Sequence, residues 1–186
     1  AEALGRAGEI GKPGVRALAL VSVAEAHLAR KEMPQAREVL DAAWEAAGKV
    51  EQLGLGDARL EILALLGAVG RCGDAAARSR AIDAAFWRDG ALAAAARGCA
   101  KAGDTETALA LAGDTRVPLW RANAYQEIAQ ARLDAGDPVA ALDAVSRIPS
   151  ERGRVKALAT LGAAHLKAGG VPSEDISRIL AGFLTR

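Results

Sequence analysis

The sequence predicts an all-α protein, built as a right-handed α-α superhelix (solenoid) of about five antiparallel helix pairs. First, the pattern Arg-x-x-Ala-(Leu/Tyr) occurs four times, and its last three copies are 33 residues apart. Second, a Gly-Asp pair recurs between predicted helices. Third, about a quarter of the residues are alanine, the best helix former, whereas only 3% are aromatic. The repeated pattern begins at Arg16, Arg88, Arg121 and Arg154.

The fourth unit of the repeat illustrates how the residues specify each helix. Apolar residues follow Arg121 at helical spacing, beginning with Tyr125. Gly136 is suited to the left-handed residue that ends a helix, and Asp137 is suited to capping the next one. A second apolar run then continues to Ile148. Each unit is therefore predicted to contain a helix A, a tight Gly-Asp turn and a helix B.

The same pattern places five helix pairs along the chain. The predicted pairs cover 15–30 with 34–47, 57–71 with 74–86, 88–102 with 104–113, 119–135 with 137–148, and 152–168 with 173–184. The predicted turns within the pairs are Lys31-Glu32, Gly73-Asp74, Gly103-Asp104, Gly136-Asp137 and Gly169-Gly170. The linker after the first pair is longer than the others and rich in glycine, which predicts a loop that bulges from the stack.

Residues 1–186 are predicted to form a single repeat domain whose two ends differ. Aligning the first Arg pattern with the last places Leu4 and Ile10 on apolar helix B positions of the fourth unit. Residues 1–12 therefore correspond to a partial repeat, which either caps the array or continues a longer one, and we favour the longer array. Residues 173–186 carry polar side chains where the pattern expects small ones, which predicts a capping helix.

This pattern resembles the tetratricopeptide repeat over nearly the whole chain. That family's unit is a helix pair with a period of about 34 residues. It has a large residue and an apolar-small pair on helix A, a Gly-centred turn, and a small residue on helix B. In the fourth unit these are Tyr125, Ile128-Ala129, Gly136 and Ala141. A HEAT-like array is the main alternative, but the constant length of helix A in three units favours the tetratricopeptide interpretation.

The composition argues against several classes of function. A net charge of +1 argues against nucleic-acid binding, which needs a concentrated basic surface. No apolar run reaches transmembrane length, so we expect no membrane insertion. No motif for catalysis, a cofactor or a metal stands out, and we expect a protein that is not an enzyme. A cytoplasmic location is slightly favoured, with export left open because the chain begins at Ala1 and not at Met.

The histidines and cysteines are interpreted as structural residues. His27 and His165 fall at equivalent places four units apart, on the order of 40 Å if packed layers are about 10 Å apart. They therefore cannot share a metal, and each is expected to fill a semi-buried packing position. Cys72 and Cys99 fall on neighbouring A helices and lack a Cys-x-x-Cys motif, so we expect buried free thiols in preference to a redox pair.

The four repeated arginines are predicted to be structural joints. An arginine at the same place in each unit is expected to connect the end of one helix B to the next unit. Trp87 and Trp120 directly precede Arg88 and Arg121, which is typical of a packed joint between repeats. These arginines are therefore not expected to bind a partner.

Other residues of the A helices are predicted to bind a partner. In the proteins that this chain resembles, helix A lines a concave groove. Mapping that face gives an apolar first half, with backbone exposed at Gly67, and a polar, basic second half, which suits a peptide. Self-association is an equal alternative, because exposed apolar patches often indicate it. The predicted partner-binding residues are Leu18, Val21, Leu60, Leu63, Arg97, Lys101, Asn123, Gln126, Gln130, Lys156 and Lys167.

We therefore expect a protein–protein interaction scaffold that holds a peptide or a partner protein in a preformed groove. Two alternatives stay open: a structural or oligomerisation segment, and a regulatory or substrate-recruiting domain of a larger, enzymatic protein. A molecular mass that rises with protein concentration would favour the oligomerisation segment.

Overall fold

We describe the fold from a computed structural model of the chain. It describes the backbone of residues 2–50 and 57–167 and the side chains of residues 4–50 and 57–163. Within those residues every regular element is an α-helix, which confirms the predicted all-α class. The predicted helix 173–184 and the middle of the long linker lie outside the described residues.

From α5 to α10 the helices alternate between shorter and longer members. The even-numbered helices are α2 (Pro13–Ala29), α4 (Ala58–Ala68), α6 (Ala85–Ala102), α8 (Pro118–Asp134) and α10 (Glu151–Lys167). The odd-numbered helices are α1 (Glu2–Gly8), α3 (Met33–Gly48), α5 (Cys72–Arg80), α7 (Thr105–Asp114) and α9 (Pro138–Ser146). Two helices depart from this alternation: α3 has 16 residues, and α4, with 11, is shorter than the other even-numbered helices. From α2 onward, the even-numbered helices correspond to the predicted A helices and the odd-numbered ones to the B helices.

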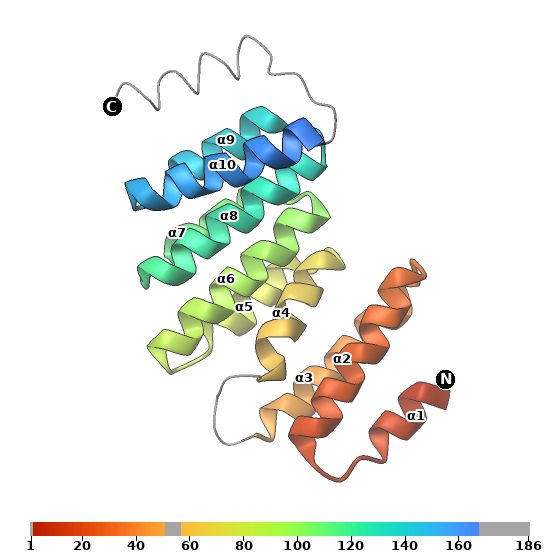
Figure 1. Cartoon of the computed structure of the whole chain (residues 1–186). Helices are drawn as coiled ribbons and strands as arrows, with labels where there is room; N and C mark the ends of the chain where they lie inside the picture. Colours follow the sequence, from red (N-terminus) through yellow and green to blue (C-terminus); the bar gives the residue numbers. More distant parts are fainter. Residues whose placement is uncertain (1, 51–56, 168–186) are drawn as a thin grey trace.

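The packing follows the order of the helices along the chain. Each even-numbered helix contacts the next one, so that α2, α4, α6, α8 and α10 form a continuous row. Each of α3, α5, α7 and α9 contacts the even-numbered helix before it and the one after it. In Figure 1, α6, α8 and α10 lie side by side in front of α7 and α9. The helix α1 packs against α2.

Glycine and aspartate form the turns between paired helices as predicted. Gly103 and Gly136 adopt φ values of 91° and 78°, in the left-handed region where a side chain is disfavoured. The carboxylate of Asp104 accepts a hydrogen bond from Thr107 N at 3.1 Å, and that of Asp137 accepts one from Ala140 N at 3.0 Å. Each aspartate therefore caps the helix that follows it.

The second repeat differs from its prediction at the turn between its helices. The turn was expected at Gly73-Asp74, but α4 ends at Ala68 and Gly70 adopts the left-handed conformation, with φ 79°. Gly73 and Asp74 instead lie inside α5, which begins at Cys72. Helix A of this unit has 11 residues, whereas its equivalents have 17 or 18, so it is almost two turns shorter.

The core is made of alanine and medium-sized aliphatic side chains, which allows the helices to approach closely. The closest approach is between α4 and α6, where Gly67 and Gly98 lie at the helix crossing. A Cβ atom on Gly98 would lie 1.9 Å from Ala64 O, and one on Gly67 would lie 2.6 Å from Cys99 N. Gly67 was expected to expose backbone to a partner; it is instead buried against α6.

Candidate partner-binding surface

The four repeated arginines have the structural role predicted for them. Each guanidinium donates a hydrogen bond to a backbone carbonyl six residues earlier, at the end of the preceding helix B. This bond satisfies a carbonyl group that the helix itself leaves without a partner. The donor–acceptor pairs are Arg16 Nε to Ile10 O at 2.8 Å, Arg88 Nη1 to Ile82 O at 3.4 Å, Arg121 Nε to Thr115 O at 2.6 Å, and Arg154 Nη1 to Ile148 O at 3.0 Å.

A fifth joint of the same kind was missed in the sequence. Arg59 donates through Nη2 to Val50 O at 3.0 Å, across the long linker between α3 and α4. Its pattern is Arg-x-x-Ile-Leu, with Ile62 at the alanine position, and the longer linker moves it out of the regular spacing. Arg59 therefore sets the register of the second repeat, in which the Arg-x-x-Ala-(Leu/Tyr) pattern has no copy.

Replacing a joint arginine is expected to lower stability without affecting a partner. In Arg121→Ala, the carbonyl of the fully buried Thr115 loses its side-chain donor. An unsatisfied buried polar group costs about 2 kcal/mol, which lowers Tm by about 4–8 °C in a domain of this size. Thermal unfolding followed by circular dichroism measures the change. The exposed Arg152→Ala is the matched control, and loss of partner binding with an unchanged Tm would contradict the structural assignment.

The arginine register identifies one face of each even-numbered helix. Positions two, nine and thirteen after the joint arginine lie on the same side of a helix, because the second and third of them follow the first by seven and eleven residues, about two and three turns. We call this surface the even-helix face. Its members include Leu18 and Glu25 on α2, Glu61 on α4, Arg97 and Lys101 on α6, Asn123 and Gln130 on α8, and Lys156 on α10.

Six of the predicted partner-binding residues lie on the even-helix face. Leu18, Lys101, Asn123 and Lys156 are exposed, and Arg97 and Gln130 are half-buried. Arg97 Nη2 forms an ion pair with Glu61 Oε2 at 3.0 Å, which joins α4 to α6 on this surface. Gln130 Nε2 donates to Asp134 Oδ1 at 2.7 Å. Lys167 lies on α10, and its side chain is outside the described set.

The other predicted residues lie away from this face. Val21 and Leu63 have 6% and 0% of their surface exposed and belong to the core, so their prediction as partner-binding residues is wrong. Leu63 lies four positions after Arg59 and is equivalent to the core residue Tyr125, so the missed arginine explains that error. Leu60 and Gln126 are half-buried, and Leu60 packs against the core.

Two acidic residues with clear contacts were not singled out from the sequence. Glu61 forms the ion pair with Arg97 described above. Asp89, on the first turns of α6, is 4% exposed, and its Oδ2 accepts hydrogen bonds from Arg116 N at 2.8 Å and Val117 N at 2.6 Å. The sequence signal for this contact is an aspartate within an apolar helix. A charged residue in such a place is usually paired, here with the backbone amides that precede the next long helix.

A charge cluster joins α3 to α5 on the opposite layer. Asp41 accepts hydrogen bonds from Arg71 at 2.7 Å and Arg78 at 2.8 Å, and the Arg78 guanidinium lies 5.2 Å from the centroid of the Trp44 ring. Burial raises the pKa of the Asp41 carboxyl, but these two hydrogen bonds outweigh burial and hold the pKa below its usual value. The cluster thus links two repeats, and within it Arg78 Nη1 is buried without a hydrogen-bond partner.

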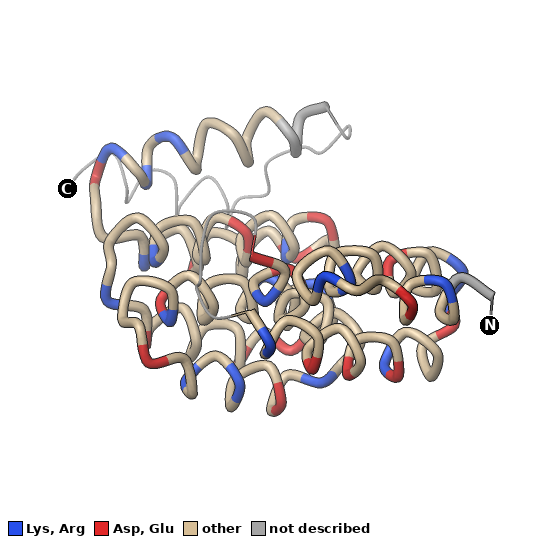
Figure 2. Tube along the Cα trace, turned by 90° about the horizontal axis from the view of Figure 1, so that it is seen from below, with Lys and Arg blue, Asp and Glu red and all other residues tan. Residues whose placement is uncertain are grey.

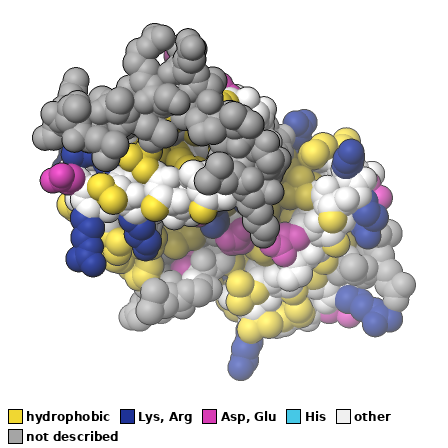
Figure 3. All heavy atoms as spheres, turned by 45° about the horizontal axis from the view of Figure 1, so that its top comes forward, with side chains coloured by type: hydrophobic (Ala, Val, Ile, Leu, Met, Phe, Trp, Pro, Cys, Tyr) yellow, Lys and Arg dark blue, Asp and Glu magenta, His cyan; other side chains and the backbone are white. Residues whose placement is uncertain are grey.

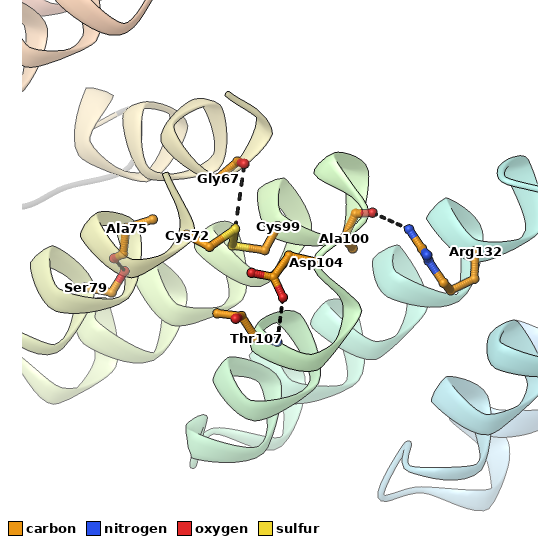
Figure 4. The surroundings of a disulfide bond; sticks show 9 residues. All are labelled: Gly67, Cys72, Ala75, Ser79, Cys99, Ala100, Asp104, Thr107 and Arg132. Carbon is orange, nitrogen blue, oxygen red and sulfur yellow. Dashed lines mark hydrogen bonds between the residues drawn. A yellow bond between two sulfur atoms is a disulfide. The ribbon is translucent and has the colours of Figure 1, made fainter. Parts of the chain in front are cut away.

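The two cysteines form a disulfide, which corrects the expectation of free thiols. Cys72 begins α5 and Cys99 lies near the end of α6, with a Cα–Cα distance of 5.6 Å. Both residues are buried (Figure 4). Beside them, Arg132 of α8 donates to Ala100 O at 2.7 Å, so that α5, α6 and α8 are connected in this region. No sequence pattern indicates this pair, because its members are 27 residues apart and form no motif.

His27 occupies a semi-buried position at the end of α2, as expected. Its Nδ1 lies 2.5 Å from Glu32 Oε2, and its side chain is 15% exposed. The hydrogen bond with His27 and a second one from Arg30 lower the pKa of the Glu32 carboxyl. The side chain of His165 lies outside the described set. Among the described residues, no group of three or more His, Cys, Asp or Glu is placed to hold a metal ion.

Charged residues of both signs are distributed along the array. Figure 2 shows Lys and Arg together with Asp and Glu over both layers of helices. On the face drawn in Figure 3, basic, acidic and hydrophobic side chains are interspersed. No helix within the described ranges combines the length and apolar character needed to cross a membrane. Searches of protein-family models, curated proteins and solved structures give no match to this chain.

Proposed function

We propose that this protein is a protein-binding scaffold, built as a tetratricopeptide-like right-handed superhelix, that holds a peptide or a partner protein on its even-helix face. The observation that supports the proposal is the continuous row of even-numbered helices, along which Leu18, Lys101, Asn123 and Lys156 are exposed. The joint arginines are engaged with backbone carbonyls. Partner contacts are therefore left to the other residues of the row.

The chemistry of the even-helix face is suited to an extended or helical peptide. Lys101, Asn123 and Lys156 are exposed on three successive even-numbered helices, and Asn123 supplies both a donor and an acceptor. At the other end of the row, Leu18 is 48% exposed and provides an apolar contact. A partner with an apolar residue and several polar or acidic groups would match this order.

Selection from a random peptide library followed by affinity measurement tests the proposal. We expect enriched peptides to lose at least about tenfold in affinity for Lys101→Glu/Lys156→Glu, because the charges of these two exposed lysines are reversed. The matched control is Lys49→Glu/Arg147→Glu, which makes the same change in charge at exposed ends of α3 and α9. Fluorescence anisotropy of labelled peptides provides the dissociation constants.

Two outcomes would contradict the even-helix face as the binding surface. In the first, no peptide is enriched over an unrelated helical protein. In the second, peptides are enriched but bind the two double variants equally. Circular dichroism of both variants would show that the substitutions leave the helices formed.

A further inference from the structure

An aromatic patch lies exposed at the beginnings of α6 and α8. Three of the chain's six aromatic residues lie here, and the Phe86 ring is 5.3 Å from the Trp87 ring and 5.8 Å from the Trp120 ring. Phe86 is 50% exposed and Leu119 is 62% exposed, whereas the two tryptophans are half-buried. We define the aromatic patch as Phe86, Trp87, Leu119 and Trp120.

The patch is formed by two equivalent joints of successive repeats. Phe86-Trp87 directly precedes Arg88, and Leu119-Trp120 directly precedes Arg121, 33 residues later. The ring of Trp120 packs over Gly90 of α6, where a Cβ atom would lie 3.3 Å from the indole. The two joints are therefore held side by side. The amides of the second joint are fixed to α6 by the buried Asp89 carboxylate.

The two joints carry opposite charges at equivalent places. Asp83 lies three residues before Phe86, and Arg116 lies three residues before Leu119. Both residues are exposed, and within the described part of the chain no ion pair engages either side chain. The apolar centre thus has an anion beside one joint and a cation beside the other.

We infer that the aromatic patch binds a second copy of this chain about a two-fold axis, with Asp83 of each copy facing Arg116 of the other. A two-fold interface needs a self-complementary surface, in which residue i meets residue j and j meets i. The two joints meet this requirement, because a two-fold rotation can place the joint with Asp83 in each copy against the joint with Arg116 in the other. Aromatic side chains are also enriched at the centres of protein interfaces.

The size of the patch indicates a weak dimer. A stable interface buries about 800 Å² per partner, which is much more than two half-exposed side chains and two half-buried indoles provide. We therefore expect a dissociation constant on the order of 100 µM, at which monomer and dimer exchange. The inference goes beyond the proposed function, because the aromatic patch lies at the helix beginnings and shares no residue with the even-helix face.

Charge reversal tests the inference, with sedimentation equilibrium of the whole chain as the measurement. Asp83→Arg alone places two arginines opposite each other, and Arg116→Asp alone places two aspartates opposite each other. Each single variant is expected to dimerise at least about tenfold more weakly than the wild type. An equimolar mixture of the two variants is expected to recover dimerisation, because both interfacial pairs then attract. Glu106→Arg, an exposed reversal on α7, is the matched control.

The mixture distinguishes this interface from other associations. A wild type that keeps its monomer mass of 19.1 kDa up to about 1 mM would overturn the inference, since a 100 µM dimer is mostly formed there. Dimerisation that is equal in both single variants and in the wild type would also overturn it. So would weakened single variants whose mixture stays monomeric, because Asp83 of one copy would then not face Arg116 of the other. Circular dichroism checks that each variant is folded.

Discussion

Gly98→Ala is expected to destabilise the protein by at least about 3 kcal/mol, at the upper end of the cost of overpacking a core. The added methyl group would lie 1.9 Å from Ala64 O, which belongs to the backbone of α4 and has no rotamer to change. The two helices would have to separate. An alanine in place of glycine otherwise favours a helix by about 1 kcal/mol, so steric overlap and helix propensity act in opposite directions.

Gly162→Ala is the matched control for this prediction. Gly162 lies within α10 and is exposed, and a Cβ atom there would meet nothing within 4 Å. We expect this variant to gain up to about 1 kcal/mol from helix propensity alone. Urea unfolding followed by circular dichroism measures both changes. A stabilised Gly98→Ala variant would show that α4 and α6 do not cross closely at this point.

Removal of the Cys72–Cys99 disulfide is expected to have the second large effect. Closing a loop between residues 27 positions apart stabilises the folded state by about 3–4 kcal/mol in the chain-entropy description. The double variant Cys72→Ala/Cys99→Ala should lose this amount, because it lacks the cross-link. Both cysteines are buried, and alanine leaves no polar group there without a partner. The midpoint of urea unfolding measures the loss.

Chemical reduction provides an independent test of the disulfide. Dithiothreitol should lower the unfolding midpoint of the wild type and leave that of the double variant unchanged. Mass spectrometry after alkylation in denaturant should find no modified cysteine without reduction and two after it. Two alkylated cysteines in the unreduced protein would restore the free thiols that the sequence favoured.

The disulfide and the glycine crossing reinforce the same part of the array. Gly67 and Gly98 bring α4 against α6, and the disulfide ties α5 to α6 beside that crossing. The crossing and the disulfide thus lie where the row contains its shortest even-numbered helix, α4. In the proposed scaffold, these contacts would hold the two ends of the even-helix face in one arrangement. The protein would then lose less conformational entropy when a partner binds.

The joints and the groove illustrate which parts of the site could be predicted. Four arginines recur at one position with the same neighbours, so their shared structural role followed from repetition alone. The groove prediction needed the rotation of each helix, and one residue of error turns a helix by about 100°. In the second repeat that error placed the core residue Leu63 on the binding surface. Val21 was placed there too, although it faces the core.

The all-α class, the alternation of helices and the turns at Gly103 and Gly136 were determined by the sequence itself. They depend on local properties: helix propensity, apolar periodicity and the left-handed conformation that glycine accepts. Only the tertiary structure decided the shortened α4, the Arg59 joint, the disulfide and the pairing of Glu61 with Arg97. These contacts join residues from different repeats, and their geometry depends on how the helices rotate and approach one another, which local patterns do not encode.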